Sequence, residues 1–88
     1  ILTLAVERGR PRARAVHVSG RAAVTRGAVR LMLQRHSGGR WRNVAAASAR
    51  LRAGRFARSF RALRPGRYRV RAAAHRHLTA PVYRAFRL

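Results

Sequence analysis

Side chains that could catalyse acid–base or nucleophilic chemistry are few in this 88-residue chain, which has one acidic residue, Glu7, and no cysteine. Carboxylate catalysis needs two carboxyl groups in different protonation states, so glycosidase and aspartic-protease chemistry is excluded. A serine triad needs a histidine that an acid orients. Only Glu7 could do this, and no serine stands in a nucleophile-elbow motif. The sequence therefore predicts no catalytic residues and no enzymatic activity. The serines are Ser19, Ser37, Ser48 and Ser59.

Histidines are the only candidate metal ligands besides Glu7. His75 and His77 stand two apart, where an extended chain would direct both rings to one side, and His17 and His36 are the other two. Zinc sites take three or four protein ligands, and Arg76 between the pair would repel a cation. There is also no glycine-rich phosphate loop and no lysine to complete one. We therefore expect no metal, no cofactor and no small-molecule substrate.

Arginine supplies all 22 basic residues and gives a formal charge of +21. In the segment 67–71, alternation would place Arg67, Arg69 and Arg71 on one face of a strand, about 7 Å apart and near the spacing of successive phosphates. Arg30 is expected to join them from a neighbouring strand. These four residues form a candidate site for anionic polymers: cell-wall polymers, acidic polysaccharides or nucleic acid.

The arginine-rich composition also has a simpler interpretation. Arginine occurs along nearly every expected strand, as it would on a solvated surface shaped by compositional bias. The triplets 39–41, 54–56 and 66–68 each combine glycine, arginine and an aromatic residue, as RNA-binding segments do. Each triplet also fits a turn glycine that precedes a strand, with the aromatic ring inward and arginine outward. We favour this second interpretation of the triplets.

Apolar residues alternate with polar ones through most of the chain, which predicts half-buried strands. Turn residues separate the strands at Gly9 to Pro11, 26–27, 37–39, Gly54 and 65–66, a spacing typical of a sandwich or barrel. The segment 43–52 could start a short helix on propensity, but we read it as a strand. Arg58 and Arg84 share parity with core positions, which requires bulges or partly exposed positions. The predicted core consists of Leu2, Leu4, Val6, Val16, Val18, Val29, Leu31, Leu33, Trp41, Val44, Leu51, Phe56, Phe60, Tyr68, Val70, Val82, Phe86 and Leu88.

Three segments within 16–74 resemble the immunoglobulin-like, fibronectin-type-III-like modules of bacterial secreted and cell-surface proteins. They are Leu31 to Val44, with its Leu-Gln-Arg run, glycine pair and tryptophan; Gly54-Arg55-Phe56; and Leu63 to Ala72, with Pro-Gly-Arg-Tyr-Arg-Val. Antibody domains carry paired cysteines and a tryptophan before this hairpin, whereas Trp41 follows the turn. The resemblance is therefore to the disulfide-free bacterial branch.

This resemblance implies an all-β, immunoglobulin-like antiparallel sandwich of about seven strands over residues 1–88. Tyr68 is expected to form a tyrosine corner, its hydroxyl bonding backbone a few residues upstream. The chain would be a single domain cut from a multidomain exported protein, a non-catalytic spacer or adhesion module on the cell surface or outside the cell. Its partners would be neighbouring domains and anionic polymers. No apolar run approaches the length of a membrane span.

Two alternatives belong to other classes. An arginine-rich nucleic-acid-binding domain would use Arg30, Arg67, Arg69 and Arg71 on phosphates, with Tyr83 or Trp41 available to stack on bases. A carbohydrate-binding sandwich would need a row of exposed aromatic rings, for which Tyr83 is the best candidate in the sequence.

Overall fold

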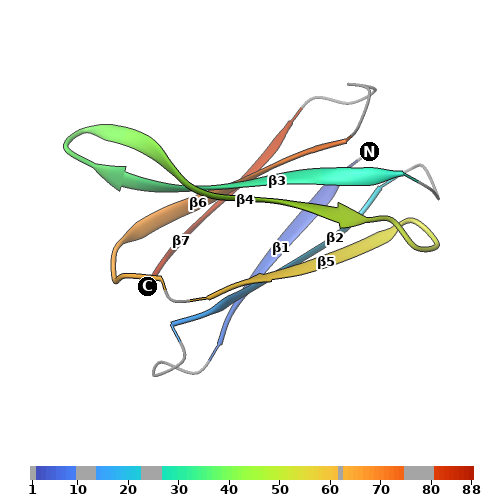
Figure 1. Ribbon diagram of the computed structural model, residues 1–88, viewed down its shortest axis with the longest axis horizontal. Coiled ribbons are helices and arrows are strands. Elements are labelled where there is room, and N and C mark those ends of the chain that lie inside the picture. The colour runs from blue at the N-terminus through green and yellow to red at the C-terminus, as the bar shows by residue number, and fades with distance from the viewer. Residues whose placement is uncertain (1, 10–13, 23–26, 62, 75–80) are drawn as a thin grey trace.

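The computed structural model describes residues 2–9, 14–22, 27–61, 63–74 and 81–88, and they form seven strands (Figure 1). The strands are β1 (Thr3–Arg8), β2 (Val16–Arg21), β3 (Ala28–Ser37), β4 (Arg40–Arg50), β5 (Arg55–Phe60), β6 (Arg67–Ala74) and β7 (Val82–Arg87). His75 and His77 lie outside the described residues, as do Pro11 and Arg26 of the expected turns. No helix that could cross a membrane is found in the described part of the chain.

The strands form two antiparallel sheets that pack face to face. The three-stranded sheet has the order β1-β2-β5, and the four-stranded sheet has the order β4-β3-β6-β7. This is the predicted immunoglobulin-like β-sandwich, with seven strands and no cysteine. The segment 43–52 is strand through Arg50, as predicted, because it pairs along its length with β3.

A two-residue turn at Gly38 and Gly39 joins β3 to β4, and this hairpin extends past the rest of the sandwich (Figure 1). Both glycines have positive φ, 59° and 77°, as the central residues of a type I′ turn do. Other residues pay a steric penalty in this conformation. The glycine pair therefore fixes the turn, and the turn sets where the strand pairing begins.

The core lies between the sheets and is built largely from the predicted residues. Eleven of them are buried: Leu2, Val16, Val18, Val29, Leu31, Leu33, Leu51, Phe56, Phe60, Tyr68 and Val70. Five more are partly buried and pack against these: Leu4, Val6, Val82, Phe86 and Leu88. Ala49, Leu63 and Ala72 complete the cluster. β3 contributes three large aliphatic side chains to this core and β2 contributes two, whereas β4 contributes alanines.

Trp41 and Val44 were predicted to lie in the core, and both predictions are wrong. The pairing of β3 with β4 shifts between Leu33 and Gln34: Leu33 faces Ala45, but Gln34 faces Asn43. Val44 is thus an extra residue, a β-bulge, and its side chain is 48% exposed. A bulge reverses the alternation, so Trp41 lies on the outer face although its sequence parity matches that of the inward-facing Ala45.

Arg58 and Arg84 were predicted to require bulges or partly exposed positions in their strands, and both occupy exposed positions on strands without a bulge. Arg58 faces Val18 and Arg84 faces Val70 across regular pairs, yet both arginines are exposed. Each stands on an edge strand, β5 or β7, where a long side chain can leave the core for water. Inward-facing charges on edge strands hinder pairing with another chain.

The predicted tyrosine corner is confirmed. The Tyr68 hydroxyl donates a hydrogen bond of 2.5 Å to the backbone carbonyl of Arg64, and the side chain is 2% exposed. The Tyr68 ring stacks on Phe86 of β7 with centroids 5.5 Å apart. Tyr68 therefore ties the loop before β6 to the core and sets the outward direction of its neighbours Arg67 and Arg69.

Candidate functional site

Four arginines that the sequence singles out share the outer face of the four-stranded sheet. Arg67, Arg69 and Arg71 alternate with buried residues along β6, and Arg30 lies on β3 beside Ala73, beyond Arg71. We call these four residues the outer arginine face. Arg30 and Arg67 are exposed and the other two are half-buried. The structure therefore brings the predicted residues together on one surface.

Arg69 at the centre of this face lies between two aromatic rings. Its guanidinium carbon is 4.5 Å from the centroid of the Trp41 ring and 4.8 Å from that of Tyr83. The rings come from the two edge strands of the sheet, β4 and β7. Each cation–π contact at an exposed site contributes about 0.5–1 kcal/mol. The two rings together hold the guanidinium over the sheet.

Amide side chains fix Arg69 further. Arg69 Nε donates to Gln34 Oε1 at 2.6 Å, and Gln34 Nε2 donates to Asn43 Oδ1 at 2.8 Å. Gln34 faces Arg69 on one side and Asn43 on the other, so the three polar groups form one row across β6, β3 and β4. Because Nε donates to Gln34, the terminal nitrogens of Arg69 are the groups that could donate hydrogen bonds to a ligand.

Trp41 is already contacted by other side chains. Arg67 lies 5.8 Å from its centroid, and the His36 ring meets it edge-on with centroids 5.1 Å apart. Tyr83, in contrast, is 49% exposed. Of the two rings considered for base stacking, Tyr83 is therefore the more accessible. A carbohydrate platform is not favoured, because Arg69 separates the two rings.

Sequence reasoning missed the parts played by Gln34, Asn43 and His36. Gln34 and His36 have the same parity as Arg30, so their outward positions follow from the alternation along β3. Asn43 faces Gln34 because of the register set by the glycine turn and the bulge at Val44. No local signal in the sequence marks that bulge.

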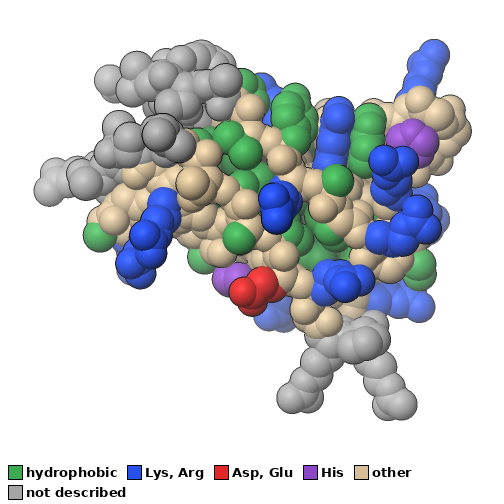
Figure 2. Space-filling view, turned by 180° about the vertical axis from the view of Figure 1, so that it is seen from behind, with side chains coloured by type: hydrophobic (Ala, Val, Ile, Leu, Met, Phe, Trp, Pro, Cys, Tyr) green, Lys and Arg blue, Asp and Glu red, His purple; other side chains and the backbone are tan. Residues whose placement is uncertain are grey.

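Arginines also face one another directly across strands. Pairs of this kind are Arg67 with Arg87, Arg35 with Arg42, and Arg21 with Arg55. Like charges at such positions destabilise a sheet. Glu7 alone cannot neutralise 22 arginines, and Figure 2 shows their side chains spread over a face with a single acidic side chain among them. The surface is a field of positive charge that attracts anions.

Glu7, His17 and Ser59 stand in one row across the outer face of the three-stranded sheet. His17 Nδ1 and Ser59 Oγ lie 3.0 Å apart, and Glu7 faces His17 across β1 and β2. All three residues are exposed. In a catalytic triad the acid holds Nδ1 and the serine meets Nε2. Here the serine occupies Nδ1, so the row gives no support to triad chemistry. No group of three potential metal ligands occurs among the described residues.

The arrangement can bind anions through the held guanidinium of Arg69 and the exposed arginines around it, and the described residues of this face include no carboxylate. No protein-family model matches this chain. No curated protein sequence matches it significantly either.

Proposed function

We propose that this chain is a non-catalytic interaction module, a spacer or adhesion domain of an exported bacterial protein, which binds an anionic polymer through the outer arginine face. The observation that carries the proposal is Arg69, whose guanidinium is held between Trp41 and Tyr83 at the centre of a row of arginines. A structural spacer needs no such arrangement on its solvent face.

Holding Arg69 in place favours binding. A free arginine side chain carries about 2 kcal/mol of rotamer entropy, part of which is lost when it engages a ligand. The rings and Gln34 restrict Arg69 before any ligand arrives, so less entropy is lost on binding. The guanidinium fork also matches phosphate and carboxylate groups in a bidentate geometry.

The spacing of the arginines favours a polymer over a single small anion. Residues two apart on a strand are about 7 Å from each other, so Arg67, Arg69 and Arg71 form a linear array of about 14 Å. Arg30 extends the array onto β3. A chain of regularly spaced charges could contact all four at once, and binding of each further charge then occurs at high effective concentration.

The resemblance to bacterial surface modules supports the exported context. The confirmed tyrosine corner and the glycine hairpin are the parts of that resemblance that bear on the fold. Neighbouring domains of the same protein would be further partners.

A salt titration tests the proposal. Binding of the 88-residue chain to heparin, to a teichoic-acid polymer, to duplex DNA and to single-stranded RNA is measured between 0.05 and 0.3 M NaCl. The face variant replaces Arg67, Arg69 and Arg71 with Gln, and a control variant replaces the exposed Arg14, Arg61 and Arg64 with Gln. Both variants lose the same charge.

We expect the face variant to weaken binding more than the control variant at every salt concentration. On duplex DNA the slope of log affinity against log salt should become shallower by about 2.7, about 0.9 for each lost phosphate contact. Equal weakening by both variants would show that the charge acts generically and would reject the face as a site. If RNA alone stays bound at 0.15 M salt and Tyr83→Ala weakens it, the domain is a nucleic-acid binder, the alternative function.

A further inference from the structure

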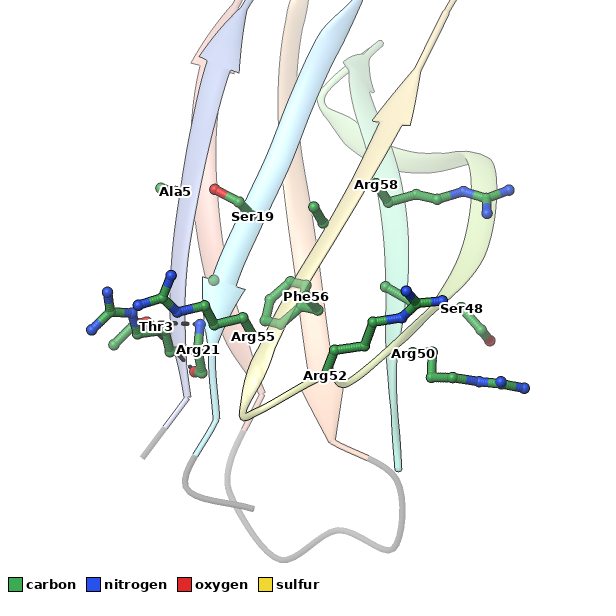
Figure 3. Close-up of a pocket in the computed structure, with 13 residues that line it drawn as sticks. Thr3, Ala5, Ser19, Arg21, Ser48, Arg50, Arg52, Arg55, Phe56 and Arg58 are labelled. Atoms are coloured by element: carbon green, nitrogen blue, oxygen red, sulfur yellow. Dashed lines mark hydrogen bonds between the residues drawn. The ribbon is translucent and has the colours of Figure 1, made fainter. Parts of the chain in front are cut away.

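Five arginines surround an open pocket of about 890 Å³ that is lined by the three-stranded sheet and by the end of β4 (Figure 3). None of the five belongs to the outer arginine face. We call this pocket the arginine pocket, and its arginines are Arg21, Arg50, Arg52, Arg55 and Arg58. In Figure 3, Arg21 and Arg55 extend to one side of the Phe56 ring, and Arg50, Arg52 and Arg58 extend to the other. All five side chains are exposed, so their guanidinium groups are accessible to a ligand.

The backbone fixes three of these arginines next to one another. Arg55 faces Arg21 across β5 and β2, and it also forms a bridge with Arg52 through two backbone hydrogen bonds of 2.8 and 3.0 Å. Ala53 and Gly54 between them have positive φ, 51° and 76°. This tight turn holds Arg52 and Arg55 at neighbouring positions on a regular scaffold.

The side of the pocket near β1 is also well defined. The backbone N–H of Arg21 donates to Thr3 Oγ1 at 3.1 Å, which ties β2 to β1 at the rim. Gly20 lets the Phe56 ring lie against β2, because a Cβ atom at Gly20 would come within 2.6 Å of that ring. Phe56 is 3% exposed, so it forms the floor of the pocket and presents no free ring face.

Arg21 and Arg52 both hold paired backbone positions with Arg55, so three like charges are concentrated here. Glu7 lies on the opposite half of β1 from the Thr3 rim and does not neutralise them. Such a cluster lowers the stability of the free protein. An anion with several charges that binds between the guanidinium groups stabilises the protein most, because it offsets the repulsion among all of them. A ligand with one charge would leave most of the repulsion in place.

We propose that the arginine pocket binds a short phosphate chain. Guanidinium groups bind phosphate oxygens through paired, charge-assisted hydrogen bonds, and a di- or triphosphate carries several negative charges that attract the five arginines of the pocket. The phosphate chain is free oligophosphate or that of a nucleotide. Because Phe56 offers no surface on which a base could stack, the pocket recognises the phosphates and leaves a base in solvent. This site goes beyond the proposed function and does not depend on it.

Calorimetric titration at 0.15 M NaCl tests the site, with the 88-residue chain and three ligands: tripolyphosphate, ATP and sucrose octasulfate. The pocket variant replaces Arg21, Arg52 and Arg55 with Gln. The face variant and the control variant described above are the matched comparisons, since each removes three charges. Amide chemical shifts of Gly20 and Phe56 report occupation of the pocket directly.

We expect tripolyphosphate to bind the unaltered chain and the pocket variant to bind it at least about tenfold more weakly, since each lost charge-assisted hydrogen bond costs close to a factor of ten. The face and control variants should change the affinity less than about threefold, the effect of charge at a distance. ATP should bind with the affinity of tripolyphosphate. Without ligand, Arg55→Thr should raise the urea midpoint of unfolding, because it removes the charge that is repelled by Arg21 and by Arg52.

Equal weakening by all three variants, or no tripolyphosphate binding at this salt concentration, would overturn the proposal. ATP binding more than tenfold tighter than tripolyphosphate binding would show that the pocket recognises the base. That result would contradict the proposal, in which the buried Phe56 offers no surface to the base. Tighter binding of sucrose octasulfate would assign the pocket to sulfate esters instead. Polymer binding by the pocket variant tests the proposed function separately, because that variant leaves the outer arginine face intact.

Discussion

The Arg69 guanidinium carbon lies 4.5 Å from the centroid of the Trp41 ring, although β3 separates their strands, β6 and β4. The contact spans the sheet because both side chains are long and both point outward. The two-residue turn pairs Trp41 with the outward-facing His36, and the extra residue Val44 then lets Ala45, which has the same parity as Trp41, face inward. The turn and the bulge in this edge strand together allow the tryptophan to lie on the surface while the alanines of β4 face the core.

A double-mutant cycle should measure the Arg69–Trp41 contact. We expect Trp41→Leu and Arg69→Gln each to lower the free energy of unfolding, and the double variant to lower it by less than their sum. The coupling energy should be about 0.5–1 kcal/mol, the value of a cation–π contact at a partly exposed site. Urea unfolding, followed by circular dichroism because one variant lacks the tryptophan, gives these free energies.

The matched cycle pairs Trp41→Leu with Arg64→Gln. Arg64 is exposed in the loop before β6, so its cycle should show no coupling. A coupling of the same size in both cycles would mean that general charge effects, and not the stacked contact, account for the first result.

Tyr68→Phe should lower the free energy of unfolding by about 1 kcal/mol. The change keeps the ring, which stacks on Phe86, and removes the hydroxyl that donates to the Arg64 carbonyl. Tyr83→Phe is the control, since its hydroxyl is on an exposed side chain and its loss should change stability by less than about 0.5 kcal/mol. Equal effects of the two changes in urea unfolding would contradict a structural role for the corner hydroxyl.

Much of the fold could be predicted from the sequence because burial on one side of a sheet imposes a period of two. Val29, Leu31 and Leu33 alternate with outward residues, and Tyr68, Val70 and Ala72 do the same on the strand that pairs with them. Glycines with positive φ then mark the turns. The tyrosine corner was predictable since Tyr68 follows a Leu-Arg-Pro-Gly turn.

The candidate site was predicted only in part. Arg67, Arg69 and Arg71 follow directly from alternation. The stack around Arg69 does not, because Trp41 and the inward-facing Ala45 have the same parity and lie on opposite faces only through the bulge at Val44. The arginine pocket also lay beyond prediction, since Arg21 and Arg55 meet only through the pairing of β2 with β5. Such long-range pairing leaves no trace in local periodicity.

Two glycines should respond differently to substitution by alanine. At Gly20 a Cβ atom would overlap the Thr3 carbonyl oxygen and lie 2.6 Å from Phe56 Cζ, so β1 or β5 must move. We expect Gly20→Ala to lower the free energy of unfolding by at least about 3 kcal/mol. At Gly38 a Cβ atom meets nothing within 4 Å, so Gly38→Ala should cost only the left-handed backbone penalty of about 1–2 kcal/mol.

Gly38→Asn refines the comparison, because asparagine tolerates the left-handed conformation and should cost less than alanine there. Thermal and urea unfolding of the three variants provide the measurement. A Gly20→Ala variant as stable as Gly38→Asn would mean that β1 does not pack against β2 as described.

Arg58 and Arg84 should protect the sheet edges from self-association. Both occupy core-facing positions on edge strands, opposite Val18 and Val70, and both reach solvent. Replacing both with Val would restore an apolar alternation on β5 and β7 and remove the charges that oppose pairing with another chain. We expect the double variant to self-associate at concentrations where the unaltered chain does not, as measured by sedimentation velocity.

The control replaces Arg61 and Arg64, which are exposed and outside the strands, with Val. It loses the same charge and gains the same apolar surface, so equal association of the two variants would trace the effect to net charge and hydrophobicity. Association of the edge variant alone would instead locate the protection at β5 and β7, where unpaired backbone groups accept a new strand.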